Sequence, residues 1–172
     1  MHAYRLPVLL ALSMLVTTST LLYAASYTFT TIDVPGATRT TALGINDREQ
    51  IVGWYVDASG RTHGFLLDEG QFTTIDIPGA VDTLAFGINN RSQVVGVYAD
   101  ASDRAHGFLW DEGAFATIDV PGATRTTALG INLRGHIVGD YSDESGRRHG
   151  FLWHEGLFTM VDVPSSTLLE PI

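Results

Sequence analysis

Three histidines recur at intervals of 43 residues, and they are the first side chains in this sequence that could do chemistry: His63, His106 and His149. Three neutral imidazoles that converge on one point could hold a zinc ion with an open coordination position. A residue that recurs at one place in every repeat more commonly serves the packing of the repeat itself. The spacing therefore favours a structural role, in which each histidine forms hydrogen bonds inside its own unit, and we assign no metal ligand.

Aspartates recur with the same spacing, each just before a Val-Pro or Ile-Pro pair: Asp33, Asp76, Asp119 and Asp162. A ring of carboxylates could bind a cation. The interpretation that we favour is local, with each carboxylate accepting a backbone N–H in the turn that follows. The loops at 57–61, 100–104 and 143–147 faintly resemble calcium loops, but they lack the twelve-residue spacing and terminal glutamate of an EF-hand. We expect hairpin turns there.

Nucleophilic catalysis has little support in the residue types. The chain has no cysteine and no lysine, and it has no Gly-x-Ser-x-Gly motif. Asp57, Ser59 and His63 lie close in the sequence, but their recurrence in other units indicates structure. The sequence predicts a protein that is not an enzyme, with no catalytic, cofactor-binding or metal-binding residue.

Aromatic residues also recur at the 43-residue interval. A rim of tryptophan and tyrosine could stack on sugar rings, but the repetition favours a place in the core between units. Trp54 breaks the pattern, since Val97 and Asp140 stand at its equivalent positions. Trp54, Asp140 and His154 are therefore better candidates for function than any repeated residue. The repeated aromatics are Phe65, Phe108, Phe151, Trp110, Trp153, Tyr55, Tyr98 and Tyr141.

These residues belong to three repeated units preceded by a partial copy. Self-similarity at this period is typical of a stack of supersecondary units that cannot bury their apolar faces alone. We predict a single β-repeat domain over residues 26–172. Its units are 41–78, 84–121 and 127–164, and its leading strand is 27–35.

Each unit contains four short segments that are rich in β-branched and aromatic residues and are separated by turn residues. Such segments are typical of strands. We expect a left-handed conformation at Asn46 in the first turn and at Gly70 in the third. In the first unit the expected strands are 41–45, 50–56, 62–67 and 71–77.

Four-stranded antiparallel units joined by a longer crossing predict an all-β, propeller-like fold. A β-trefoil, with three units of four strands, is the alternative. Three units are too few to close a propeller ring, which usually has four to eight blades. An open arc exposes strand edges, so we expect self-association or pairing with another β-repeat chain, unless the chain is a fragment of a longer protein.

The first 25 residues read as a signal peptide. A basic residue, Arg5, precedes an apolar run over 6–16, and small residues near Ala24 and Ala25 suit cleavage. An uncleaved membrane anchor is the alternative. The prediction is a secreted, periplasmic or cell-surface protein with no membrane association after cleavage.

The charge balance argues against one class of partner. The chain carries 10 basic and 19 acidic residues, a formal net charge of −9. An acidic surface repels nucleic acid and anionic membrane. We expect no nucleic-acid partner.

The repeated motifs resemble a known family. The runs Gly44-Ile45-Asn46, Ile51-Val52-Gly53 and His63-Gly64-Phe65-Leu66, followed by Asp76-Ile77-Pro78-Gly79-Ala80, are similar to the probable extracellular HAF repeat family of bacteria. Trp110 and Trp153 match its pattern, Leu67 departs from it, and Gly64, Gly107 and Gly150 stand where the family usually has alanine. The resemblance implies an exported protein with a propeller-like β fold, and it brings no established activity.

These observations together predict an exported, non-enzymatic repeat protein that binds or assembles at the cell surface or outside the cell. Two alternatives remain open. One is a carbohydrate-binding module, with a glycan as partner, and the other is a fragment of a larger propeller hydrolase or lyase.

Overall fold

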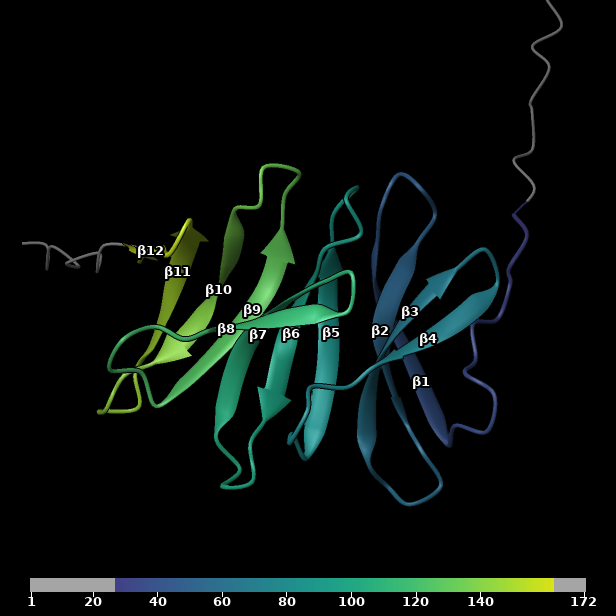
Figure 1. The fold of residues 1–172 in the computed structure, drawn as a ribbon, viewed down its shortest axis with the longest axis horizontal. Helices are drawn as coiled ribbons and strands as arrows, with labels where there is room; N and C mark the ends of the chain where they lie inside the picture. Colours follow the sequence, from purple (N-terminus) through teal and green to yellow (C-terminus); the bar gives the residue numbers. More distant parts are fainter. Residues whose placement is uncertain (1–26, 163–172) are drawn as a thin grey trace, which may run out of the picture. The chain divides into compact units, whose positions relative to one another are not determined.

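The structure is a computed structural model that describes residues 27–162. From Thr31 onward these residues belong to one compact unit. It contains twelve strands, which form three antiparallel sheets of four strands each (Figure 1). The first sheet comprises β1 (Arg39–Ile45), β2 (Ile51–Val56), β3 (Thr62–Asp68) and β4 (Gln71–Ile75). The second comprises β5 (Asp82–Ile88), β6 (Val94–Ala99), β7 (Ala105–Asp111) and β8 (Ala114–Ile118). The third comprises β9 (Arg125–Ile131), β10 (Ile137–Ser142), β11 (Arg148–His154) and β12 (Leu157–Val161).

The strands of each sheet lie in chain order, and every described strand pairs only with neighbours from its own unit. This confirms the predicted all-β fold of three four-stranded antiparallel repeats. A trefoil would join strands of different units in one barrel, so the alternative is wrong. The strands begin and end within two residues of the predicted segments, because the turn residues between them set the boundaries.

The first turn of each unit corrects one local expectation. The Oδ1 atom of Asn46 accepts hydrogen bonds from the backbone N–H groups of Arg48 and Gln50, both at 3.0 Å. The left-handed conformation falls on Glu49, with φ of 61°, and not on the asparagine. Asparagine is used here because its short amide side chain satisfies the turn's N–H groups.

The third turn follows the expectation. Gly70 has φ of 80°, and Glu69 before it has φ of 46°. Two consecutive positive φ angles are typical of the two-residue type I′ hairpin, whose twist matches that of the flanking strands.

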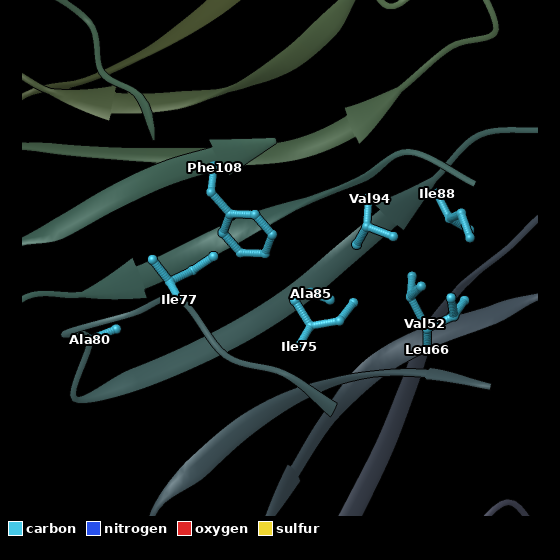
Figure 2. Packing of buried hydrophobic residues seen from close by; sticks show 9 residues of the cluster. All are labelled: Val52, Leu66, Ile75, Ile77, Ala80, Ala85, Ile88, Val94 and Phe108. Atoms are coloured by element: carbon cyan, nitrogen blue, oxygen red, sulfur yellow. The ribbon is translucent and has the colours of Figure 1, made fainter. Parts of the chain in front are cut away.

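The sheets pack face to face. Strand β5 lies against β1, β2 and β3 of the first sheet, and β9 lies against β5, β6 and β7 of the second. Figure 2 shows the apolar cluster at the first of these interfaces, which contains residues of both sheets. Its members are Val52, Leu66, Ile75, Ile77, Ala80, Ala85, Ile88, Val94 and Phe108. An equivalent cluster joins the second and third sheets, so the arrangement is an open succession of three sheets joined by two repeated interfaces.

Glycine permits the close approach of consecutive first strands. A Cβ atom on Gly44 would lie 2.8 Å from the carbonyl oxygen of Phe86, and one on Gly87 would lie 3.0 Å from that of Leu129. Both distances are below ordinary van der Waals contact, so a larger residue would push the sheets apart.

The predicted leading strand is not found, since no residue from 27 to 38 is in a strand. Its counterpart β4 pairs with β3, whose sequence carries His63-Gly64-Phe65. The positions 43 residues earlier, Thr20-Leu21-Leu22, lack that pattern. The described residues therefore offer 27–35 no partner strand.

The predicted signal peptide, residues 1–25, lies outside the described residues. Within residues 27–162, no helix is long and apolar enough to span a membrane.

Candidate functional site

Each repeated histidine lies between two aspartates of its own unit. His63 Nδ1 lies 2.9 Å from Asp76 Oδ1, and His63 Nε2 lies 3.2 Å from Asp57 Oδ2. The register of β3 and β4 pairs Gly64 with Ile75, and this places His63 opposite Asp76 one residue further along. The ring of Tyr55 stacks on the imidazole, with ring centroids 5.1 Å apart. Both ring nitrogens are therefore used inside the unit.

The other two units repeat this arrangement. His106 lies 2.6 Å from Asp119 and 3.2 Å from Asp100. His149 lies 2.6 Å from Asp162 and 3.2 Å from Asp143. Because each imidazole bonds to carboxylates of its own unit, the three histidines do not form a shared zinc site. Within the described part of the chain, no three His, Cys, Asp or Glu side chains are placed to hold a metal ion.

The electrostatics of these groups follow from their contacts. Burial alone would lower the pKa of His63, but the hydrogen bonds that it donates to Asp76 and Asp57 outweigh burial and raise the pKa above its ordinary value. The pKa of His106 is raised in the same way, and that of His149 is raised chiefly by its hydrogen bond to Asp162. These shifts favour the imidazolium form, which donates a hydrogen bond at both nitrogens.

The pKa values of the turn aspartates Asp57, Asp100 and Asp143 shift in the opposite direction. The hydroxyl of Ser59, followed by the backbone N–H of Arg61 and by His63, holds the pKa of Asp57 far below its usual range. Backbone N–H donation from Arg104 and the bond to His106 lower the pKa of Asp100. These three turn carboxylates therefore stay ionised and pair with the protonated rings.

A serine-based catalytic arrangement needs the hydroxyl on the imidazole. Ser59 Oγ instead donates to Asp57 Oδ1 at 2.7 Å, and His63 Nε2 is occupied by the other oxygen of the same carboxylate. Asp57 and Ser59 belong to the turn between β2 and β3, and His63 at the start of β3 contacts this turn through Asp57. The geometry at Asp57, with N–H groups of Ser59 and Arg61 bound to Oδ1, confirms the predicted hairpin turn.

The expected role of the aspartates before proline is wrong. Asp76 binds His63, thirteen residues earlier, and not an N–H of the following turn. That turn supplies its own bond, from Ala80 N–H to the carbonyl of Ile77 at 3.0 Å. The carboxylate is thus free to reach across to the neighbouring strand.

The repeated phenylalanines are core residues, as predicted. Phe65, Phe108 and Phe151 are all buried. The repeated tyrosines are only half-buried; they stack on the histidines, and Tyr55 shares a hydrogen bond of 3.1 Å with Thr74. Their position serves the histidine contacts rather than the centre of the core.

The unrepeated candidates lie at separate places. The guanidinium of Arg39 covers the ring of Trp54 at 4.6 Å, and Asp140 forms an ion pair of 2.8 Å with Arg148. His154 lies against His136, with ring centroids 4.1 Å apart. In the first sheet the same two positions hold Gln50 and Asp68, which form a hydrogen bond of 2.9 Å. The structure therefore brings together one histidine pair, but it does not unite the candidates in one site.

The feature that sequence reasoning missed is the pair of end faces. Val52 and Val95 are completely buried between sheets, whereas Val138 at the equivalent position of the third sheet is 50 % exposed. Val161 is 58 % exposed, although its counterparts Ile75 and Ile118 are buried. We call the surface formed by Val138, Val161 and the adjacent Gly130 the C-terminal end face.

The first sheet shows the same change on its opposite side. Ile45 is 67 % exposed, whereas its counterpart Ile88 is buried against the first sheet. Ala42 is exposed, whereas Ala85 is buried in the same cluster. We call the surface formed by Ala42, Ile45 and the half-buried Ile51 the N-terminal end face. The sequence predicted exposed strand edges at the ends, but the apolar surface lies on the faces of the end sheets, because stacking buries faces.

Comparison with known proteins adds no relative to this description: no family model, no curated protein and no solved structure matches the chain. The resemblance to the HAF repeat family stays a prediction.

Proposed function

We propose that this chain is an exported, non-catalytic repeat protein that acts by binding or assembly at the cell surface or outside the cell. The observation that carries the proposal is the contrast between the end faces and the interior. The positions of Val138 and Val161 are buried in both preceding units and exposed in the third, and Ile45 is exposed where Ile88 is buried. Contiguous exposed apolar surface on a folded protein indicates an interaction site.

The polar groups support the same conclusion. The residues with the most perturbed pKa values can mark a catalytic site. Here the perturbed groups, such as His63 and Asp57, recur in all three units and bond to one another. Their chemistry is used to hold each hairpin, and the faces and loops are left for partners.

Two measurements test the proposal. Expression of the full chain in a bacterial host, followed by cell fractionation and N-terminal sequencing, should find the protein outside the cytoplasm with a new N-terminus near Ala24. Light scattering of the purified product, and its retention on envelopes of the same cells, should show association or surface binding. A product that stays in the cytoplasm, or that shows neither association nor binding, contradicts the proposal.

A glycan array separates the carbohydrate-binding alternative from assembly. Retention of a defined sugar, lost on substitution of Trp54 by alanine, would favour that alternative.

A further inference from the structure

We propose that the partner of the two end faces is a second copy of this chain, with the C-terminal end face of one copy packed on the N-terminal end face of the next. This inference rests on the proposed assembly function and names its partner and contact. The resulting interface would be a third instance of the one that already joins the first sheet to the second and the second to the third.

The C-terminal end face supplies one half of that interface. Within the chain, this half includes Val52 and Ile75 at the first interface and Val95 and Ile118 at the second. Their counterparts in the third sheet, Val138 and Val161, are also apolar residues of similar size. At these two positions the third sheet therefore presents apolar side chains like those of the two sheets that are covered.

The N-terminal end face supplies the other half. At the first interface this half contains Ala85, Ile88 and Val94. The first sheet places Ala42, Ile45 and Ile51 at the equivalent positions. Two of the three residues are identical and the third changes valine to isoleucine, so the surface that would cover the third sheet is present on every copy.

The glycines point to the same contact. Gly44 and Gly87 leave room for the first strand of the next sheet, whose backbone would lie about 3 Å from an added Cβ. Among residues 27–162, a Cβ on Gly130 would meet only Val138, at 3.4 Å. Gly130 thus retains space for a neighbouring strand that no described strand fills.

A ladder of asparagines crosses the interfaces. Asn46 Nδ2 donates to the carbonyl of Asn89 at 2.9 Å, and Asn89 Nδ2 donates to the carbonyl of Asn132 at 3.0 Å. Asn132 has the same turn, with its Oδ1 bound to the N–H groups of Arg134 and His136. Its amide is placed to donate to the carbonyl of Asn46 in a second copy.

The stacking has one steric condition. Ile32 lies 43 residues before Ile75 and 129 before Val161, so Ile32 of the second copy and Val161 of the first would occupy equivalent places. The N–H group of Val34 donates a hydrogen bond to Thr40 Oγ1 at 3.1 Å, and this bond ties the chain to the first sheet from Val34 onward. Docking therefore requires residues 31–33 of the second copy to move aside.

The contact joins two different surfaces, so it is heterologous. After each added copy, an assembly built on such an interface still has one free face of each kind. Its growth therefore ends only when a ring closes. This property gives a test that ordinary hydrophobic aggregation does not pass.

The test uses one arginine on each face of the full chain, Val138→Arg and Ala42→Arg. The wild-type chain should associate in light scattering, and each variant alone should have the mass of a monomer. An equimolar mixture should form a dimer with one copy of each variant and nothing larger. The intact C-terminal end face of the Ala42→Arg variant packs on the intact N-terminal end face of the Val138→Arg variant, and both outer faces of this dimer carry an arginine. Leu157→Arg is the matched control, since its counterparts Gln71 and Ala114 are exposed even where a sheet follows; it should associate as the wild type does.

Circular dichroism should show an unchanged β-sheet spectrum in every variant. If an arginine variant loses that spectrum, Val161→Asp and Ile45→Asp carry the same test on other residues of the two faces. A monomeric wild-type chain, with its faces covered by its own residues 1–30 or 163–172, overturns the inference. So does association that both variants retain, or the absence of a dimer from a mixture of folded variants. An exported monomer that binds envelopes would overturn this inference and leave the proposed function intact.

Discussion

The second and third sheets are built from nearly the same sequence, yet they present different surfaces. Both carry valine at the second position of their second strand, Val95 in β6 and Val138 in β10. The first is buried under β9, and the second is half exposed. In a repeat protein the burial of a side chain therefore depends on whether a neighbouring unit stacks against its sheet, and not on its position in the unit alone.

The largest expected contrast is between Val95→Ala and Val138→Ala. Removing two methyl groups from the buried position should lower the free energy of unfolding by about 2–3 kcal/mol, from lost transfer energy and a residual cavity. The half-exposed position should lose no more than about 0.5 kcal/mol. Urea denaturation of both variants under conditions that keep the chain monomeric measures the contrast, and equal losses would contradict it.

Gly87→Ala and Gly130→Ala should differ next. The added methyl group at Gly87 meets the backbone of Leu129 and Gly130, and overpacking of this kind should cost about 2 kcal/mol. At Gly130 the unfolding free energy should stay within about 0.5 kcal/mol of wild type, while self-association weakens. Thermal denaturation and light scattering together check this pair, and a destabilised Gly130 variant with unchanged association would reverse the interpretation.

The asparagine ladder offers a smaller effect. Asn89→Asp removes the donor to the carbonyl of Asn132 and should cost about 1 kcal/mol. Asn132→Asp keeps the oxygen that holds its own turn and should leave unfolding nearly unchanged, with weaker association. The measurement is chemical denaturation followed by sedimentation of each variant.

The smallest effect is a pH dependence that all three sheets share. Each histidine binds its proton more tightly in the folded state, so this contribution to stability is complete below the unfolded pKa of about 6.5. It is lost as the pH rises through the higher folded pKa. We therefore expect the melting temperature to fall above that pH, and His106→Gln and His149→Gln to flatten the fall equally, because the contact lies within each unit.

The acid side has the opposite sign. The lowered pKa values of Asp57 and Asp143 contribute stability above the unfolded value of about 3.9. That contribution is lost as the pH falls through the depressed folded values. Melting temperatures from pH 3 to 9 should therefore pass through a maximum, and a monotonic curve would contradict both assignments.

Much of the fold could be predicted from local chemistry. The strands around Ile51 and Thr62 follow from β-branched and aromatic residues between turn formers, and Gly70 marks its hairpin correctly. The partner of Asp76 could not be predicted, because it depends on the register of β3 and β4, which brings together residues thirteen positions apart. The role of the asparagine turns was missed for a similar reason, since Asn46 acts across the sheet interface on Asn89.

The period, the strands and the turns follow from the amino-acid sequence, because they depend on residues that are near one another in the chain. The sequence also placed apolar residues at most of the equivalent interface positions of the three units, such as Val52, Val95 and Val138. Which of these residues are buried and which are exposed depends on the packing of the sheets, as the contrast between Ile88 and Ile45 shows. Burial depends on what stacks against a face, and the stacking of three sheets covers the inner faces and leaves the two end faces open.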